Sequence, residues 1–229
     1  MVDVSGQVNA VAREVQTTDG DGAETDGAAM RVQTLTQVYP SGLEDVWDAV
    51  TSLERIPRWF LPLEGDLRVG GRYQFVGNAG GEVIECEPPD RGLARYRVTW
   101  EFGGGVTWVQ VRLADLGDGR TRLELQHTAR TSDMPPGFWE QFGPGATGVG
   151  WDGGLLGLSL HLSGDSAVAP DTAAEWAVSD EGRRFHRAAA DAWAAAHVAS
   201  GASPDAAARA ADATFAFYTG EAPEEGAGS

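Results

Sequence analysis

The sequence predicts an α+β fold in which a curved antiparallel sheet wraps around one long helix and carries a helical extension. Three observations lead to this prediction. The middle of the chain alternates apolar and polar residues over several short segments, which is typical of antiparallel strands with one buried face. Residues 143–162 are apolar and rich in glycine, which predicts the long helix. Two alanine-rich helical patterns follow residue 163 and predict the extension.

The first 29 residues are predicted to form a short helix and an acidic linker. Ser5 can cap a helix that carries Val8, Val11 and Val15, which are spaced three and four residues apart. Residues 17–29 hold four acidic side chains among Gly, Thr and Ala, a composition that buries almost no apolar surface. We therefore expect this segment to be a solvated linker.

The next segment predicts one strand followed by short helical turns. Residues 31–39 alternate imperfectly between apolar and polar side chains, and Pro40 ends this strand. An amphipathic helix is then indicated by four apolar residues at helical spacing, Leu43, Val46, Trp47 and Val50. A further turn around Trp59 is limited by Pro57.

The middle of the chain predicts an antiparallel meander. Its strands are expected over residues 72–75, 83–87, 93–102, 107–113 and 123–127. Glycine pairs separate several of these segments, and Asp118-Gly119 is a strong hairpin signal. Because apolar and polar residues alternate, one face of the sheet is expected to be buried and the other wet.

The C-terminal part is predicted to be helical. Glycines in the helix over 143–162 allow it to pack close to a sheet or a ligand. In the extension, Ser203-Pro204 begins the last helix and Gly220 ends it. The predicted division is an N-terminal segment over 1–29, a main domain over 30–163, a helical extension over 164–220 packed on it and a frayed tail over 221–229.

Composition excludes several classes of partner. The 17 basic residues, all arginine, face 34 acidic ones, and the net charge of −17 repels nucleic acid and anionic membrane surfaces. Cys86 is the single cysteine, so the chain has neither an internal disulfide nor a cysteine-based zinc site. No run of 18 apolar residues and no secretion signal are found, so we expect a cytoplasmic protein that spans no membrane.

An ordered set of motifs resembles the START-like (SRPBCC) domains. The segment Tyr39–Ala49 is similar to the opening of such domains in the subgroup related to the C-terminal domain of the heat-shock-protein-90 ATPase activator. The resemblance covers roughly residues 30–163 and continues through Arg58–Phe60, Gly70–Tyr73, Gly81–Pro89, Thr99–Glu101 and Thr121–His127. It implies a helix-grip fold with a cavity between a curved sheet and a C-terminal helix. It implies no single activity, because relatives include lipid and hormone binders, aromatase/cyclases, an enediyne resistance protein and co-chaperones.

His127 is the most informative single residue. By alternation it points inward with Leu123 and Leu125, where an imidazole could hydrogen-bond a ligand or act as an acid or base. The alternative is a buried histidine that ties neighbouring strands together, since buried polar groups usually find partners within the protein. Both interpretations stay open on the sequence alone.

Other motifs point to packing rather than chemistry. Residues 143–148 fit G-x-G-x-x-G, but a proline-rich break precedes this segment and no strand follows it, so the glycines are expected to serve close packing rather than a nucleotide. His161, His186 and His197 have no partner at metal-ligand spacing. The sequence thus predicts no metal, no cofactor and no catalytic set.

Aromatic side chains gather on the predicted inner faces. The expected lining of a ligand cavity consists of Tyr73, Phe75, Tyr96, Trp100, His127, Trp151 and Trp59. We expect a protein that binds a hydrophobic or aromatic small molecule there rather than an enzyme. Two alternatives remain: a cyclase, aromatase or hydrolase that uses His127 with a tyrosine or Asp152, and a co-chaperone-like module that binds a protein. A homodimer also stays open.

Overall fold

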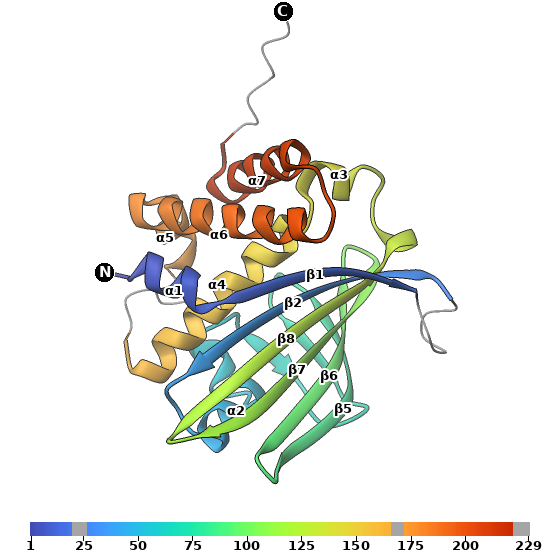
Figure 1. The fold of residues 1–229 in the computed structure, drawn as a ribbon. Helices are drawn as coiled ribbons and strands as arrows, with labels where there is room; N and C mark the ends of the chain where they lie inside the picture. The colour runs from blue at the N-terminus through green and yellow to red at the C-terminus, as the bar shows by residue number, and fades with distance from the viewer. Residues whose placement is uncertain (20–26, 166–171, 222–229) are drawn as a thin grey trace, which may run out of the picture.

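A curved sheet of eight antiparallel strands dominates the computed structural model, which describes residues 1–19, 27–165 and 172–221. The strand order is β1-β2-β8-β7-β6-β5-β4-β3. The strands are β1 (Ala12–Asp19), β2 (Ala29–Tyr39), β3 (Leu63–Gly65), β4 (Arg72–Phe75), β5 (Gly80–Asp90), β6 (Leu93–Phe102), β7 (Gly105–Gly117) and β8 (Arg120–Arg130). The predicted α+β helix-grip architecture is confirmed (Figure 1).

The meander follows the alternation of the sequence. In the β7–β8 pair Val111 lies opposite Leu125 and Leu113 opposite Leu123, and all four side chains are buried. Asp118 and Gly119 both have positive φ angles, as a tight hairpin requires, and the ladder resumes at Arg120. The register therefore directs one continuous apolar face toward the helices.

The N-terminal segment differs from the prediction. Helix α1 (Val4–Ala10) is capped by Asp3, whose carboxylate accepts a hydrogen bond from the backbone N–H of Gly6, and not by Ser5. Val11 and Val15 lie outside this helix, and Val15 belongs to β1, which pairs along β2 as an additional strand. The expected acidic linker over 17–29 is thus part strand, and its residues 20–26 lie outside the described residues.

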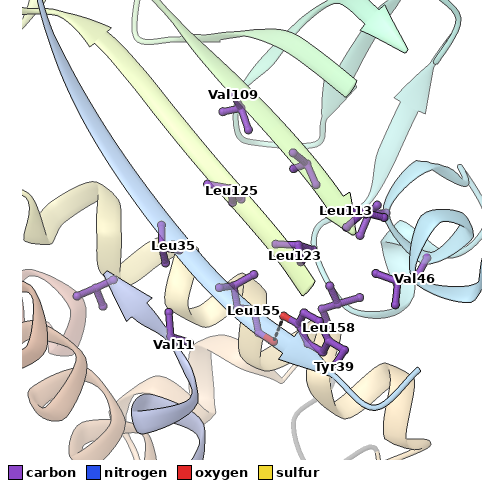
Figure 2. Close-up of a cluster of buried hydrophobic side chains, with 14 of the residues drawn as sticks. Val11, Leu35, Tyr39, Val46, Val109, Leu113, Leu123, Leu125, Leu155 and Leu158 are labelled. Atoms are coloured by element: carbon purple, nitrogen blue, oxygen red, sulfur yellow. Dashed lines mark hydrogen bonds between the residues drawn. The ribbon is translucent and has the colours of Figure 1, made fainter. Parts of the chain in front are cut away.

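Helix α4 (Gly145–Ser163) lies along the concave face of the sheet and ends at Gly164, which adopts a left-handed conformation. Its Leu155 and Leu158 pack against the strands, and the Tyr39 hydroxyl donates a hydrogen bond of 3.3 Å to the carbonyl oxygen of Leu155 (Figure 2). Helix α2 (Leu43–Thr51) closes the other end of this core with Val46 (Figure 2).

The extension covers the side of α4 that faces away from the sheet. Helices α6 (Asp180–Ala199) and α7 (Pro204–Thr219) lie against α4, and α6 also contacts α1 and β1 (Figure 1). Ser203 caps α7 and Gly220 ends it in a left-handed conformation, as predicted. The shorter elements are η1 (Ile56–Arg58), η2 (Thr131–Asp133), α3 (Phe138–Phe142) and α5 (Ala173–Val178).

The predicted tail over 221–229 lies outside the described residues except for Glu221. The domain boundaries themselves stay a prediction. Of the helices in the described part of the chain, none is long and apolar enough to cross a membrane.

Candidate functional site

A cavity of about 110 Å³ lies between the sheet and α4. Its walls include six of the seven residues that the sequence predicts to line a ligand site, namely Tyr73, Phe75, Tyr96, Trp100, Trp151 and Trp59. The seventh, His127, lies behind Trp151 and lines a second hollow instead. Strands β4 and β6, helix α4 and the end of η1 thus bring six of the seven predicted residues together.

The aromatic rings of the cavity wall hold one another in place. The ring centroids of Phe75 and Trp100 are 5.5 Å apart, and those of Trp100 and Trp151 are 4.9 Å apart. The indole N–H of Trp59 donates to the carbonyl oxygen of Ala49 at 2.9 Å. Such tilted and edge-on contacts stabilise a wall of fixed shape.

The two tyrosine hydroxyls in this apolar wall differ in their hydrogen bonding. The Tyr73 hydroxyl donates to the carbonyl oxygen of Thr99 at 2.6 Å, so it is already engaged. For the Tyr96 hydroxyl no hydrogen bond is found among the described residues, and burial raises its pKa well above the ordinary value. Burial also raises the pKa of the Cys86 thiol, which therefore stays protonated. The Tyr96 hydroxyl is consequently available to an occupant of the cavity.

His127 is fully engaged within the fold. The indole N–H of Trp151 donates to His127 Nδ1 at 2.9 Å, so the neutral ring carries its hydrogen on Nε2 and donates it to Thr107 Oγ1 at 2.7 Å. The Thr107 hydroxyl in turn donates to the carbonyl oxygen of Trp100 at 3.1 Å. Burial lowers the pKa of His127 to about 4, which keeps the ring neutral near pH 7. These bonds favour the interpretation in which His127 ties the structure together and fixes Trp151.

Asp152, the proposed acid–base partner of His127, is hydrogen-bonded to groups other than His127. Its carboxylate accepts hydrogen bonds from Arg13 at 2.7 and 3.2 Å and from the Trp193 indole at 2.8 Å. Burial raises the pKa of Asp152, while Arg13 and Trp193 oppose that shift. The two groups that hydrogen-bond His127, from Thr107 and Trp151, do not titrate near neutral pH.

The second hollow, which we call the α4 groove, has a volume of about 490 Å³. It runs between α4 and the extension, and it shares Trp59, Phe60, Trp100, Trp151 and Gly154 with the cavity. Helices α5, α6 and α7 contribute Trp176, His186 and Tyr218 to it. Sequence reasoning missed this groove because its walls come from segments that are distant along the chain.

The glycine motif over 143–148 serves close packing, as expected. A Cβ atom on Gly148 would lie 2.2 Å from Cε2 of Trp193, and one on Gly145 would lie 2.4 Å from the Thr214 hydroxyl oxygen. Helices α6 and α7 therefore approach α4 where only glycine fits.

Comparisons with known proteins agree with this architecture. The sequence profile of the family described as activator of Hsp90 ATPase homolog 1-like protein matches residues 41–152. The crystal structure of CalU16 from Micromonospora echinospora is 30% identical, with a TM-score of 0.62 over 82% of this chain and 98% of that one. Its solution structure is 32% identical, with a TM-score of 0.65 over 83% and 97%.

A more distant structure, the conserved protein EF2215 of unknown function from Enterococcus faecalis, has a TM-score of 0.50 at 14% identity, over 73% of this chain and 84% of that one. At that identity the likeness concerns the fold alone. No curated protein matches this chain.

Proposed function

Since this chain belongs to the activator of Hsp90 ATPase homolog 1-like family, we propose that it binds a hydrophobic or aromatic small molecule in the cavity between the sheet and α4. The observation that supports this proposal most is the Tyr96 hydroxyl. It lies in an apolar wall and has no hydrogen-bond partner among the described residues, whereas Tyr73 in the same wall has one. The hydroxyl of this half-buried residue is not one of the fully buried polar atoms that lack a partner, so solvent reaches it, and a ligand that bonds it would replace water.

The size of the cavity indicates the size of its ligand. Cavities of roughly 150 Å³ lined by apolar side chains take up one benzene ring. The cavity here measures about 110 Å³ and is lined by aliphatic and aromatic side chains, so it suits a single ring or a short alkyl group. A hydroxyl on that ring would meet Tyr96.

Ligand binding fits the wall better than the enzymatic alternative does. Acid–base catalysis needs a titratable group poised near the operating pH. His127 is instead neutral and bonded on both nitrogens, and Asp152 is held by Arg13. The protein-binding alternative finds no comparable support in the described residues.

Isothermal titration with p-cresol and toluene tests the proposal, because the two molecules differ by one hydroxyl. We expect p-cresol to bind the native protein about 10-fold more tightly than toluene, as one net hydrogen bond allows. Tyr96→Phe should abolish this preference. Tyr73→Phe is the matched control, because its hydroxyl is already bonded to Thr99, and it should keep the preference.

Two results would contradict the proposal. One is the absence of binding of either probe at millimolar concentration. The other is an unchanged preference for p-cresol in Tyr96→Phe. Native mass spectrometry of freshly purified protein adds an independent measurement, because a co-purified ligand would appear as a mass increment that heating or organic solvent removes.

A further inference from the structure

The cavity and the α4 groove share a partition that consists mainly of aromatic rings. Five residues border both hollows, namely Trp59, Phe60, Trp100, Trp151 and Gly154. The centroid of the Trp151 ring lies 4.9 Å from that of Trp100 and 6.2 Å from that of Phe60, so these rings are in contact. A ring-sized molecule does not pass between rings in contact. Its passage from the groove to the cavity therefore requires that one ring of the partition moves.

The rings of this partition differ in how firmly they are held. The Trp59 indole donates to the carbonyl oxygen of Ala49, a residue with 0% exposure, and its own carbonyl oxygen lies 2.2 Å from where a Cβ atom on Gly157 would be. Moving Trp59 would leave a buried carbonyl without its donor. The Trp151 indole donates instead to His127, which borders the groove and not the cavity. Water in the groove can replace this bond, so Trp151 is the ring that moves at the lower cost.

The groove also has room for the Trp151 ring. Its volume of about 490 Å³ compares with about 110 Å³ for the cavity. Gly153, two residues after Trp151 on α4, borders the groove, and a Cβ atom on Gly153 would meet nothing within 4 Å. An indole that rotates toward this open space leaves its contact with Trp100 and uncovers the cavity.

We propose that Trp151 is a gate through which the ligand of the cavity enters from the α4 groove, and that the hydrogen bond to His127 holds this gate closed. The inference rests on the proposed function, because it names the path of that ligand. His127 is then a positioning residue, which acts through Trp151 and does not touch the ligand. A gate changes the rates of association and dissociation by the same factor and leaves the affinity unchanged, because the free and bound states at the two ends of the path stay the same.

A pair of variants at Gly153 tests the path. Line-shape analysis of the p-cresol methyl signal by NMR gives both rate constants and the Kd. Gly153→Leu projects a side chain into the groove beside Trp151 and should slow association and dissociation about 10-fold each, with the Kd within twofold of the native value. Gly153→Ala is the matched control and should keep both rates within twofold. Native rates in Gly153→Leu would overturn the path through the groove.

A second pair of variants tests the bond that holds the gate. His127→Phe keeps a ring but removes the acceptor of the Trp151 indole, so both rates should rise about 5-fold, as the loss of one net hydrogen bond allows, at an unchanged Kd. His127→Asn offers a side-chain oxygen near the place of Nδ1 and should restore both rates to within twofold. Equal rates in the native protein and His127→Phe, or equal acceleration in His127→Phe and His127→Asn, would overturn the role of His127.

The same titrations separate this inference from the proposed function. Native protein that binds no p-cresol would contradict the proposed function and remove the gate with it. Native protein that binds p-cresol, with rates that neither Gly153→Leu nor His127→Phe changes, would contradict the gate alone. The Gly153 pair decides on the path even where His127→Phe does not fold, because neither Gly153 variant alters the cavity wall.

Discussion

The two sides of helix α4 differ in how their space is filled. Toward β1 and α6, Asp152 is 1% exposed and bonded to Arg13 and Trp193, and the Trp193 ring lies against Gly148. Toward the sheet and the groove, the same helix borders hollows of about 110 and 490 Å³, and Gly153 faces open space. One side is closed by a buried ion pair and a packed tryptophan, whereas the other side borders unfilled space.

This difference suggests that one side of α4 supplies stability and the other side leaves space for a ligand. Unfilled volume beside apolar side chains forgoes contacts and lowers stability. The packed side compensates, because the Arg13–Asp152 pair joins β1 to α4 and the hydrogen bond from Trp193 to Asp152 joins α6 to α4. A helix anchored on one side can leave its other side open to a ligand without losing its position.

The largest expected effect comes from breaking the anchor. Asp152→Ala leaves the buried Arg13 guanidinium without its carboxylate, and removing one partner of a buried pair costs about 3–5 kcal/mol. Urea unfolding should show this loss as a lower midpoint. Asp48→Ala is the control, because its pair with Arg55 is exposed and exposed pairs contribute roughly 0–1 kcal/mol. Equal effects of the two variants would contradict the anchor.

A pH dependence should arise on the open side, where burial lowers the pKa of His186 to about 4. The unfolded chain binds this proton near pH 6.5 and the folded chain only near pH 4, so stability is full above about 6.5 and falls as the pH drops toward 4. His186→Phe removes this group together with its two unpaired nitrogens. Its stability advantage over the native protein should grow by roughly 2–3 kcal/mol between pH 7 and 4.5.

Urea unfolding of both proteins at the two pH values measures this difference, and the common titration of the carboxylates cancels in the comparison. His127, whose pKa burial also lowers to about 4, remains in both proteins and cancels likewise. An advantage that is equal at both pH values would show that His186 titrates normally in the folded state.

Local patterns predicted much of the fold because their causes are local. Alternation along β4 and β6 predicted which of their side chains line the cavity, and Ser203 and Gly220 marked the ends of α7. Strand β1 was missed because Val8, Val11 and Val15 fit a helical spacing, and Arg13 interrupts the apolar residues that would otherwise alternate. The carboxylate that pairs with this buried arginine belongs to Asp152, which lies 139 residues away along the chain.

The cavity could be predicted from the sequence, whereas the α4 groove could not. Strand alternation and the family resemblance placed the cavity residues together. The groove depends on how α5, α6 and α7 pack on α4, and the isolated position of His186 in the sequence carries no signal of the hollow beside it.

A smaller effect is expected where a methyl group is added to the packed side. Gly148→Ala places a Cβ atom 2.2 Å from the Trp193 ring, so α6 must shift or the ring must leave Asp152. Overpacking of this kind costs about 1–3 kcal/mol, of which the better helix propensity of alanine recovers up to about 1 kcal/mol. Thermal unfolding should show a lower Tm, with near-ultraviolet circular dichroism changed in the tryptophan region. An unchanged Tm would mean that α6 or the Trp193 ring can shift to accommodate the methyl group without loss of stability.

The smallest effect, and of opposite sign, is expected for the same substitution on the open side. Gly153→Ala adds a methyl group five residues further along the same helix, where nothing lies within 4 Å of the new atom. Only the helix propensity changes, and alanine is favoured over glycine by about 1 kcal/mol in a helix interior. The free energy of unfolding should therefore rise by about 0.5–1 kcal/mol in the same urea titrations. Because the two alanine variants share one helix and one chemical change, opposite signs can come only from the space beside each residue. A loss of stability in Gly153→Ala would mean that the groove is filled in solution.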